Sequence, residues 1–129
     1  MLFDNYVVAG RLARYAPEGR AINTTISTAS VATNRAPRYG KQLVSHLSRR
    51  SVGVWDESTR TGTLDMNDGA AHVTFDSTPD ALQIAVHADD ADLATYEDVV
   101  GRHLVRFGER DELHVAWTRA DGTPGTSQA

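Results

Sequence analysis

Imidazole groups are the most versatile chemical groups in this sequence, since it has five histidines and no cysteine. Neutral imidazole binds transition metals and exchanges protons near neutral pH. Two histidines, His72 and His87, fall in neighbouring segments whose apolar residues alternate with period two, as in half-buried strands. The hairpin expected around Asp68-Gly69 places Asp65 opposite His72. A carboxylate beside two imidazoles suits a transition metal or a metal chelate.

The same alternation predicts a larger polar surface on one face of a sheet. If Leu64, Val73 and Ile84 point to the helices, the alternate residues point away from them. Five of these outward residues are the candidate ligand-binding set: Trp55, Asp65, His72, His87 and His114. An outward tryptophan often marks a contact site. A solvated antiparallel face, a self-associating face and a small metal-dependent enzyme that uses the outward histidines are the alternatives.

A second histidine pair, His46 and His103, lies at the edges of the apolar stripes of two predicted helices. If both helices pack on the same sheet face, the two rings could approach each other. Two histidines alone make a poor metal site, so we expect them to tie the helices together, with metal binding as the alternative. Neighbouring helical residues project about 100° apart, so Ser45 and His46 do not form a proton relay. We predict no catalytic residue and expect the protein to bind a ligand rather than to catalyse a reaction. No cofactor is identified from the sequence; iron or another transition metal is the candidate.

The elements that position these side chains follow from the order of hydrophobic periods. Helical spacing covers 36–50, alternation covers 52–87, helical spacing returns at 91–107, and a last alternating run covers 112–118. This order predicts an α+β two-layer sandwich, with an antiparallel sheet in β-α-β-β-β-β-α-β order and two helices packed on one face. The first strand is expected at 25–33.

Turn and cap residues give the expected registers. A turn near Glu57-Ser58-Thr59 pairs Val52 with Leu64. The Asp68-Gly69 turn pairs Leu64 with Val73, and the next loop pairs Phe75 with Leu82. All three registers put apolar residues on the helix side. The expected helix ends are Thr33 or Asn34 before the first helix, Asp89 and Asp90 before the second, and Gly108 as a left-handed cap after it.

Length and composition indicate one globular domain. We expect a single domain at 25–119, an N-terminal extension at 1–24 and a flexible C-terminal tail at 120–129. The formal net charge of −4 and the single lysine argue against a nucleic-acid partner. The chain begins without a basic leader and has no long apolar stretch, which predicts a cytoplasmic protein that does not span a membrane.

Several ordered runs between 29 and 117 resemble a bacterial family catalogued as domain of unknown function 2218. The runs are Ser30-Val31-Ala32-Thr33; Tyr39 with Gln42-Leu43 and His46; 62–69; Glu97-Asp98-Val99-Val100 with His103-Leu104 and Arg106-Phe107; and Glu112-Leu113 with Val115-Ala116-Trp117. The family usually shows a Cys-Lys-His-Trp-like run where this chain reads Val44-Ser45-His46-Leu47, and it often has His where Ser30 stands.

The resemblance implies a TATA-binding-protein-like fold, similar to the C-terminal domain of phosphohexomutases. It also implies a link to iron, because some members are associated with siderophore uptake or with siderophore-interacting flavoproteins. We therefore expect a binding or accessory domain that serves iron–siderophore handling. The expected partners are an iron chelate or a siderophore-interacting protein, with a homodimer or interaction module as the alternative.

Overall fold

The computed structural model describes residues 6–8, 11–15 and 21–129, and it describes side chains from Thr24 onward. In this part of the chain, nine strands form one antiparallel sheet. The strands are β1 (Tyr6–Val8), β2 (Arg11–Tyr15), β3 (Ala21–Ala32), β4 (Ser51–Asp56), β5 (Thr61–Met66), β6 (Ala71–Ser77), β7 (Ala81–Asp89), β8 (Val115–Arg119) and β9 (Pro124–Gln128). The two α-helices are α1 (Ala36–Leu47) and α2 (Leu93–Phe107). Three 3₁₀ turns, η1 (Ser48–Arg50), η2 (Asp90–Asp92) and η3 (Glu109–Asp111), flank them.

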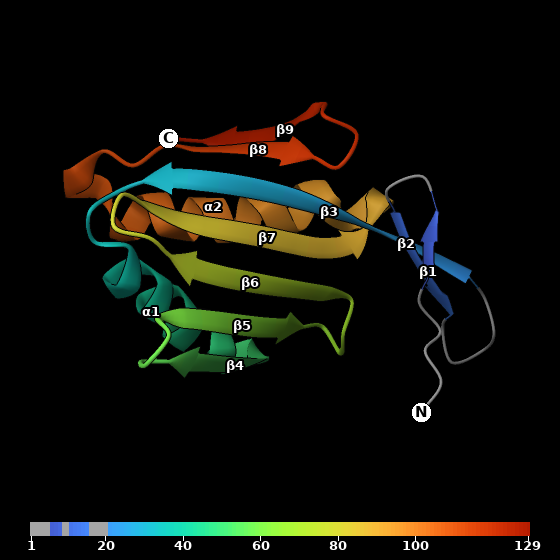
Figure 1. The fold of residues 1–129 in the computed structure, drawn as a ribbon, viewed down its shortest axis with the longest axis horizontal. Helices are drawn as coiled ribbons and strands as arrows, with labels where there is room; N and C mark the ends of the chain where they lie inside the picture. The colour runs from blue at the N-terminus through green and yellow to red at the C-terminus, as the bar shows by residue number, and fades with distance from the viewer. Residues whose placement is uncertain (1–5, 9–10, 16–20) are drawn as a thin grey trace.

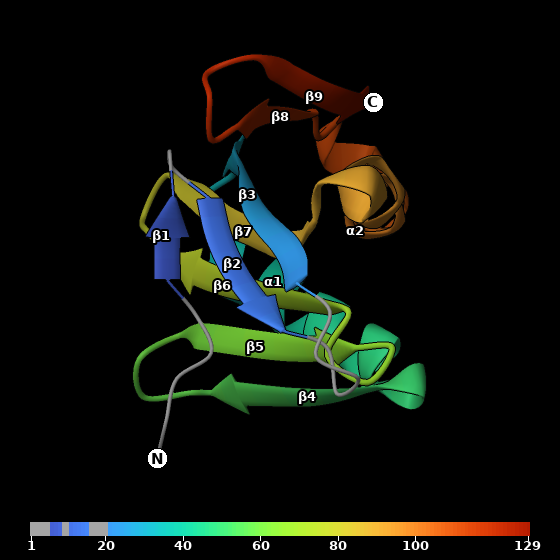
Figure 2. The ribbon, with the colours of Figure 1, turned by 90° about the vertical axis from the view of Figure 1, so that its right-hand side faces the viewer.

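Both helices lie on one face of the sheet and leave the other face without a helix (Figures 1 and 2). The sheet runs β1-β2-β3-β7-β6-β5-β4, and β8 pairs with the same edge of β3 as β2 does, followed by β9. The predicted α+β sandwich and the order from β3 to β8 are confirmed. Strands β1, β2 and β9 extend that core arrangement at the two ends of the chain.

The core lies between the helices and the sheet, because the inward residues of each strand are apolar. On the central strands Leu64, Val73 and Val86 are fully buried, and Leu43 of α1 and Leu104 of α2 cover them from the helix side. Burial of one such side chain is worth about 1.5–3 kcal/mol. The alternation of buried and exposed residues along β6 and β7 is therefore what fixes the face that each histidine occupies.

The central hairpins confirm one predicted register and shift another. Leu64 pairs with Val73, as predicted. Phe75 pairs with Ile84 rather than with Leu82, because the turn closes one residue later, where Thr78 N donates to Ala81 O at 2.9 Å. A partner two residues further along lies on the same face, so the core side of β7 is unchanged.

The predicted register of β4 is wrong by one residue, which inverts the strand. Gly53, not Val52, pairs with Leu64, and Val52 pairs with Asp65. The turn takes four residues, 57–60, because the Asp56 carboxylate accepts the Ser58 N–H at 2.8 Å and holds a wider loop. Val52 and Val54 therefore point outward, with 67% and 60% of their surface exposed.

The helix ends differ in detail from the expected caps. The residue before α1 is Arg35, and the Thr33 hydroxyl accepts the Arg35 N–H at 3.0 Å. Asp89, predicted as a cap at the start of the second helix, caps η2, the 3₁₀ turn that leads into α2, by accepting the Ala91 N–H at 3.3 Å. Gly108 has φ −99°, so it is not a left-handed cap; Glu112, with φ 53°, takes that conformation after η3.

The interpretation of 120–129 as a flexible tail is wrong, because 124–128 form β9. This strand pairs with β8 and packs against α2. At the other end, the first core strand begins at Ala21 rather than at residue 25, and residues 21–24 pair with β2. In the described part of the N-terminal extension, 6–8 and 11–15 form strands β1 and β2. No helix in the described residues is long and apolar enough to cross a membrane.

Candidate functional site

Three of the five predicted outward residues do come together on the helix-free face. The His72 Nδ1 and Asp65 Oδ1 atoms are 2.7 Å apart, and the two residues are direct cross-strand partners. His87 lies directly opposite His72 rather than diagonally across, with ring centroids 6.0 Å apart. Burial is the main cause that lowers the pKa of His87, and the charge of the nearby His72 lowers it further. We call Asp65, His72 and His87 the histidine row.

Trp55 does not belong to this face. The one-residue shift of β4 turns the indole toward α1, where it covers Gly40 and Gly62. A Cβ atom on Gly40 would lie 2.8 Å from Trp55 Cζ3, so glycine is required for this close approach. The Trp55 Nε1–H donates to Glu57 Oε1 at 3.1 Å. The predicted outward tryptophan is thus a packing residue of the helix layer.

His114 is also separate from the histidine row. Thr118 of β8 pairs with Thr28, and the antiparallel register carries His114 toward the Ala32 end of β3. His87 pairs with Ile26, near the other end of that strand. Six residues of a strand span about 20 Å. The proposed five-residue surface is therefore reduced to the histidine row.

The histidine row is a line of side chains across three strands rather than a shared coordination point. Within the described residues, no three or more His, Asp or Glu side chains are grouped so that they could hold a metal ion. What the row offers is a hydrogen-bonded carboxylate–imidazole pair with a second imidazole beside it. Such a pair can hold and pass a proton.

The second predicted pair, His46 and His103, meets between the helices. Their ring centroids are 5.1 Å apart, and the edge of Phe107 lies 5.3 Å from His46. His103 Nδ1 lies 2.6 Å from the Val99 carbonyl oxygen, which can only accept, so Nδ1 carries the proton. In the neutral ring, Nε2 of His103 is then the acceptor nitrogen.

Three adjoining cavities, with volumes of about 460, 430 and 480 Å³, run between α1 and α2 past these rings. The first and second share His46 and Arg49, and the second and third share Arg38, Gln42 and Phe107. Because neighbouring cavities share these lining residues, we call the three together the inter-helix groove. Its principal residues are Arg38, Gln42, His46, Arg49, His103, Arg106 and Phe107.

The lining of the groove has more cations than carboxylates, although the chain is acidic overall; its carboxylates are Glu109 and Asp111. Within the described residues, no carboxylate forms an ion pair with Arg38, Arg49 or Arg106. Cations near the groove that do have partners are Arg35, Lys41 and Arg102, which pair with Asp111 at 3.9 Å, Glu57 at 2.6 Å and Asp98 at 3.6 Å. Burial lowers the pKa of His46, and the charges of His103, Arg49 and Arg106 lower it further.

This arginine cluster is not among the predicted sites, although a usable signal was present in the spacing. Positions 38 and 42 of α1 and 49 of the following η1, with His46 beside them, fall on one helical face, and 99, 103 and 106 do so on α2. Only the packing of the two helices side by side turns these stripes into one groove.

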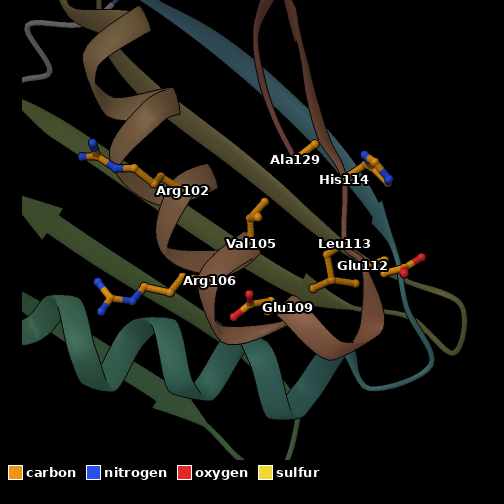
Figure 3. Close-up of a pocket in the computed structure, with 8 residues that line it drawn as sticks. All are labelled: Arg102, Val105, Arg106, Glu109, Glu112, Leu113, His114 and Ala129. Carbon is orange, nitrogen blue, oxygen red and sulfur yellow. The ribbon is translucent and has the colours of Figure 1, made fainter.

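A fourth cavity, of about 640 Å³, lies at the C-terminal end of α2 (Figure 3). It is lined by Arg102, Val105, Arg106, Glu109, Glu112, Leu113, His114 and Ala129. Figure 3 shows the Arg102 and Arg106 guanidinium groups directed away from Leu113. With two arginines, two glutamates and an apolar floor, its lining selects no particular ligand chemistry.

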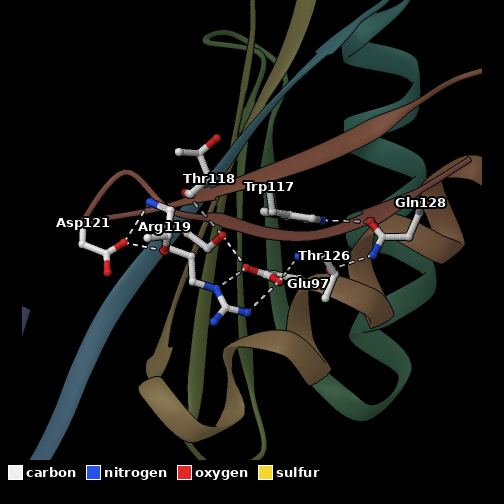
Figure 4. A network of polar contacts seen from close by, with 9 residues as sticks. Glu97, Trp117, Thr118, Arg119, Asp121, Thr126 and Gln128 are labelled. Carbon is white, nitrogen blue, oxygen red and sulfur yellow. Dashed lines mark hydrogen bonds and ion pairs between the residues drawn. The ribbon is translucent and has the colours of Figure 1, made fainter.

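One buried carboxylate, Glu97, joins α2 to the C-terminal hairpin (Figure 4). It accepts hydrogen bonds from Ser27 Oγ at 2.6 Å, Arg119 Nε at 3.1 Å and the Thr126 N–H at 2.9 Å. Burial alone would raise its pKa, but the bonds from Arg119, Ser27 and Thr126 together lower it. We call these four residues the Glu97 network; its members are fully engaged with one another, so its role is structural.

Comparison with known proteins identifies the family. The model of a family described as uncharacterized proteins conserved in bacteria, domain of unknown function 2218, matches residues 28–118. The chain belongs to this family. Among solved structures, the NMR structure of PA4090 from Pseudomonas aeruginosa is similar, with a TM-score of 0.57 and 27% identity over 73% of this chain and 95% of that one. No curated protein matches the chain. Strand β9, which completes the Glu97 network, lies outside the matched residues.

Proposed function

We propose that this domain binds an anionic small molecule in the inter-helix groove. The observation that carries the proposal is that three arginines, Arg38, Arg49 and Arg106, line adjoining cavities and have no ion-pair partner among the described residues. Guanidinium groups match carboxylate, phosphate and catecholate oxygens because they offer several N–H donors in one plane. The groove therefore has the donors that an anion requires. The carboxylates that also line it, Glu109 and Asp111, lie in the cavity next to Arg106, and Asp111 is paired with Arg35.

The aromatic residues of the groove favour a ligand with a flat or conjugated part. The His46 ring lies 5.1 Å from that of His103 and 5.3 Å from that of Phe107, so the groove presents an aromatic cluster to a planar group. The neutral form of His46, which its lowered pKa favours, suits stacking and hydrogen bonding rather than charge. An anion with aromatic or conjugated groups combines both requirements.

A ferric chelate of net negative charge is the ligand class to test first. Catecholate siderophores carry aromatic rings and, once loaded with iron, a negative charge. The support for iron comes from the family resemblance, while the support for an anion comes from the groove. In this reading the domain is an accessory that holds the chelate.

The test is calorimetric titration of the protein with a gallium(III) tris-catecholate complex, which copies the ferric complex without paramagnetism. Arg49→Ala and Arg106→Ala should each weaken binding about tenfold, since a hydrogen bond to a charged group is worth about 1.5–3 kcal/mol. NMR spectra of the same samples should show shifts at His46, His103 and Phe107.

Arg102→Ala is the matched control, because it removes the same charge from α2 at a residue that is paired with Asp98. It should change the affinity by less than about twofold, as expected for an exposed pair. Equal weakening by all three variants would mean that only the overall charge attracts the ligand, and would contradict a groove site. A parallel titration with pyrophosphate separates the anion from the chelate: binding of pyrophosphate alone would remove iron from the proposal.

A second candidate function uses the histidine row, supported by the 2.7 Å contact between Asp65 and His72. That pair could act in proton transfer, and it could bind a divalent metal if the His87 side chain moved to the same coordination point. Titration with zinc should then shift the imidazole NMR signals of His72 and His87 together, and His72→Ala should abolish the shift at His87. Unchanged His87 signals in the presence of zinc would eliminate the metal role.

A further inference from the structure

The free edge of β4 has features that natural sheet edges usually avoid. In the described part of the chain, β4 pairs with β5 alone and forms the lower margin of the sheet in Figure 1. Its six residues, Ser51–Asp56, contain no proline and no lysine, and the pairing with β5 is free of bulges. Two valines, Val52 and Val54, are exposed on it. Edge strands are ordinarily protected by such interruptions or charges, because their unpaired N–H and C=O groups accept another strand.

From these features we infer that β4 pairs antiparallel with β4 of a second copy of this chain, in a register centred on Gly53. This dimer is independent of the proposed ligand site. The two sheets join into one, and the helices of both copies lie on the same face. In this register Val52 lies opposite Val54 of the second copy, and Val54 opposite its Val52. Four exposed valines thereby form one apolar cluster on the helix-free face.

Charge complementarity selects the same register. Centring the pair on Gly53 brings Arg50, the last residue of η1 before β4, near Asp56 of the second copy at each end of the shared strand. The Asp56 hydrogen bonds to Ser58 and Thr59 all use Oδ1, so Oδ2 is available to a guanidinium group. Arg50 has no ion-pair partner within the described residues.

The neighbouring registers on the same face are poorer. Centring on Val54 would place Val52 opposite Asp56, and centring on Val52 would place Val54 opposite Arg50. Each combination buries a charge against a valine and leaves it without a partner. A register shifted by one residue would set Val52 beside Trp55 and turn the second helix layer to the opposite face.

The helix layer leaves room for the second copy. Helix α1 packs on β5, β6 and β7 as well as on β4, so it lies across the sheet rather than beyond its margin. Pairing through one six-residue strand gives an interface at or below the about 1,200 Å² at the low end of stable complexes. We therefore expect a weak dimer whose population rises with concentration.

Cysteine cross-linking tests both the dimer and its register, since the natural chain has no cysteine. Val52→Cys and Val54→Cys are made separately and oxidised alone and as an equal mixture. Directly opposite residues lie about 4.5–5.5 Å apart between Cα atoms, within disulfide reach. The mixture should form a disulfide-linked dimer at least about tenfold faster than either variant alone, a difference of about 1.4 kcal/mol in activation free energy.

Three results would overturn the inference. Faster cross-linking of one variant alone would assign a different register. Equal rates in all samples would indicate random collision, and a monomer mass for the natural chain up to about 1 mM would show that no dimer of even millimolar affinity forms. Thr63→Lys separates edge pairing from stacking of two sheet faces: Thr63 lies beside Val54 on the helix-free face but away from the edge. When Thr63→Lys is added to Val52→Cys and Val54→Cys, the rate of cross-linking in their mixture should not change. A loss of cross-linking would mean that the two sheet faces stack instead.

Discussion

Strands β9 and β4 lie at opposite edges of the sheet, and only β9 has the features that protect an edge (Figure 1). β9 begins at Pro124, carries small polar residues and is joined to α2 through the buried Glu97. β4 is apolar and carries exposed valines, and its own Trp55 packs against Gly40 of α1. A proline and a buried polar network mark an edge that is complete within one chain, whereas an unprotected apolar edge invites a partner.

Among the substitutions that test this difference, removal of the Glu97 carboxylate should lower the free energy of unfolding most. Glu97→Ala leaves Arg119 and the Thr126 N–H without their acceptor in a buried place. Breaking a buried ion pair in this way costs about 3–5 kcal/mol, which urea unfolding would measure. Asp98→Ala is the matched control, since that carboxylate is exposed and should cost less than about 0.5 kcal/mol. Similar losses in the two variants would show that the network does not secure β9.

Gly40→Ala tests the packing of Trp55, on β4, against α1. The sign of the change in the free energy of unfolding shows whether this contact leaves room for a side chain. Alanine alone would stabilise a helix by about 1 kcal/mol relative to glycine. Here the new Cβ would lie 2.8 Å from Trp55 Cζ3, and such overpacking costs about 1–3 kcal/mol. We expect a net loss of about 1 kcal/mol in the free energy of unfolding.

Trp55→Ala provides the control for that substitution, because it removes the two closest atoms that the alanine would meet and leaves only Leu82 Cδ1, at 3.3 Å. In the Trp55→Ala background, Gly40→Ala should become stabilising. If it remains destabilising there, the indole does not cause the cost, and the account of how β4 is held would be wrong.

Alternation and turn residues in the sequence predicted the fold, including the pairing of Leu64 with Val73, because both signals are local. They did not predict the face of Trp55, since one extra turn residue held by Asp56 inverts a whole strand. They also missed β9, whose polar residues show no apolar alternation and which is secured by Glu97, 29 residues away from Thr126. The inter-helix groove was not predicted for a related reason. The residues that line it come from separate helical segments, and only the packing of these segments brings Arg49 near His103.

Acid should weaken the β9 edge more than the β4 edge. The hydrogen bonds from Arg119, Ser27 and Thr126 give Glu97 a lower pKa than in the unfolded chain, even though burial acts against this. Its contribution to stability is therefore complete above the unfolded pKa of about 4.3 and is lost as the pH falls through the lower, folded pKa. Unfolding free energies measured from pH 7 downward should fall less steeply in Glu97→Gln than in the natural chain. Equal slopes would show that Glu97 does not contribute to acid sensitivity.

The smallest effect on stability is expected at the β4 edge, and there the contrast with β9 is sharpest. Val54→Lys changes an exposed side chain, so the free energy of unfolding of the monomer should change by less than about 0.5 kcal/mol. The same substitution places a charge against Val52 of a second copy and should abolish the rise of mass with concentration in sedimentation experiments. Val54→Thr, which keeps the β-branched shape, should retain most of that rise. Loss of association together with loss of stability in Val54→Lys would indicate that β4 is secured within one chain, as β9 is, and the difference between the two edges would disappear.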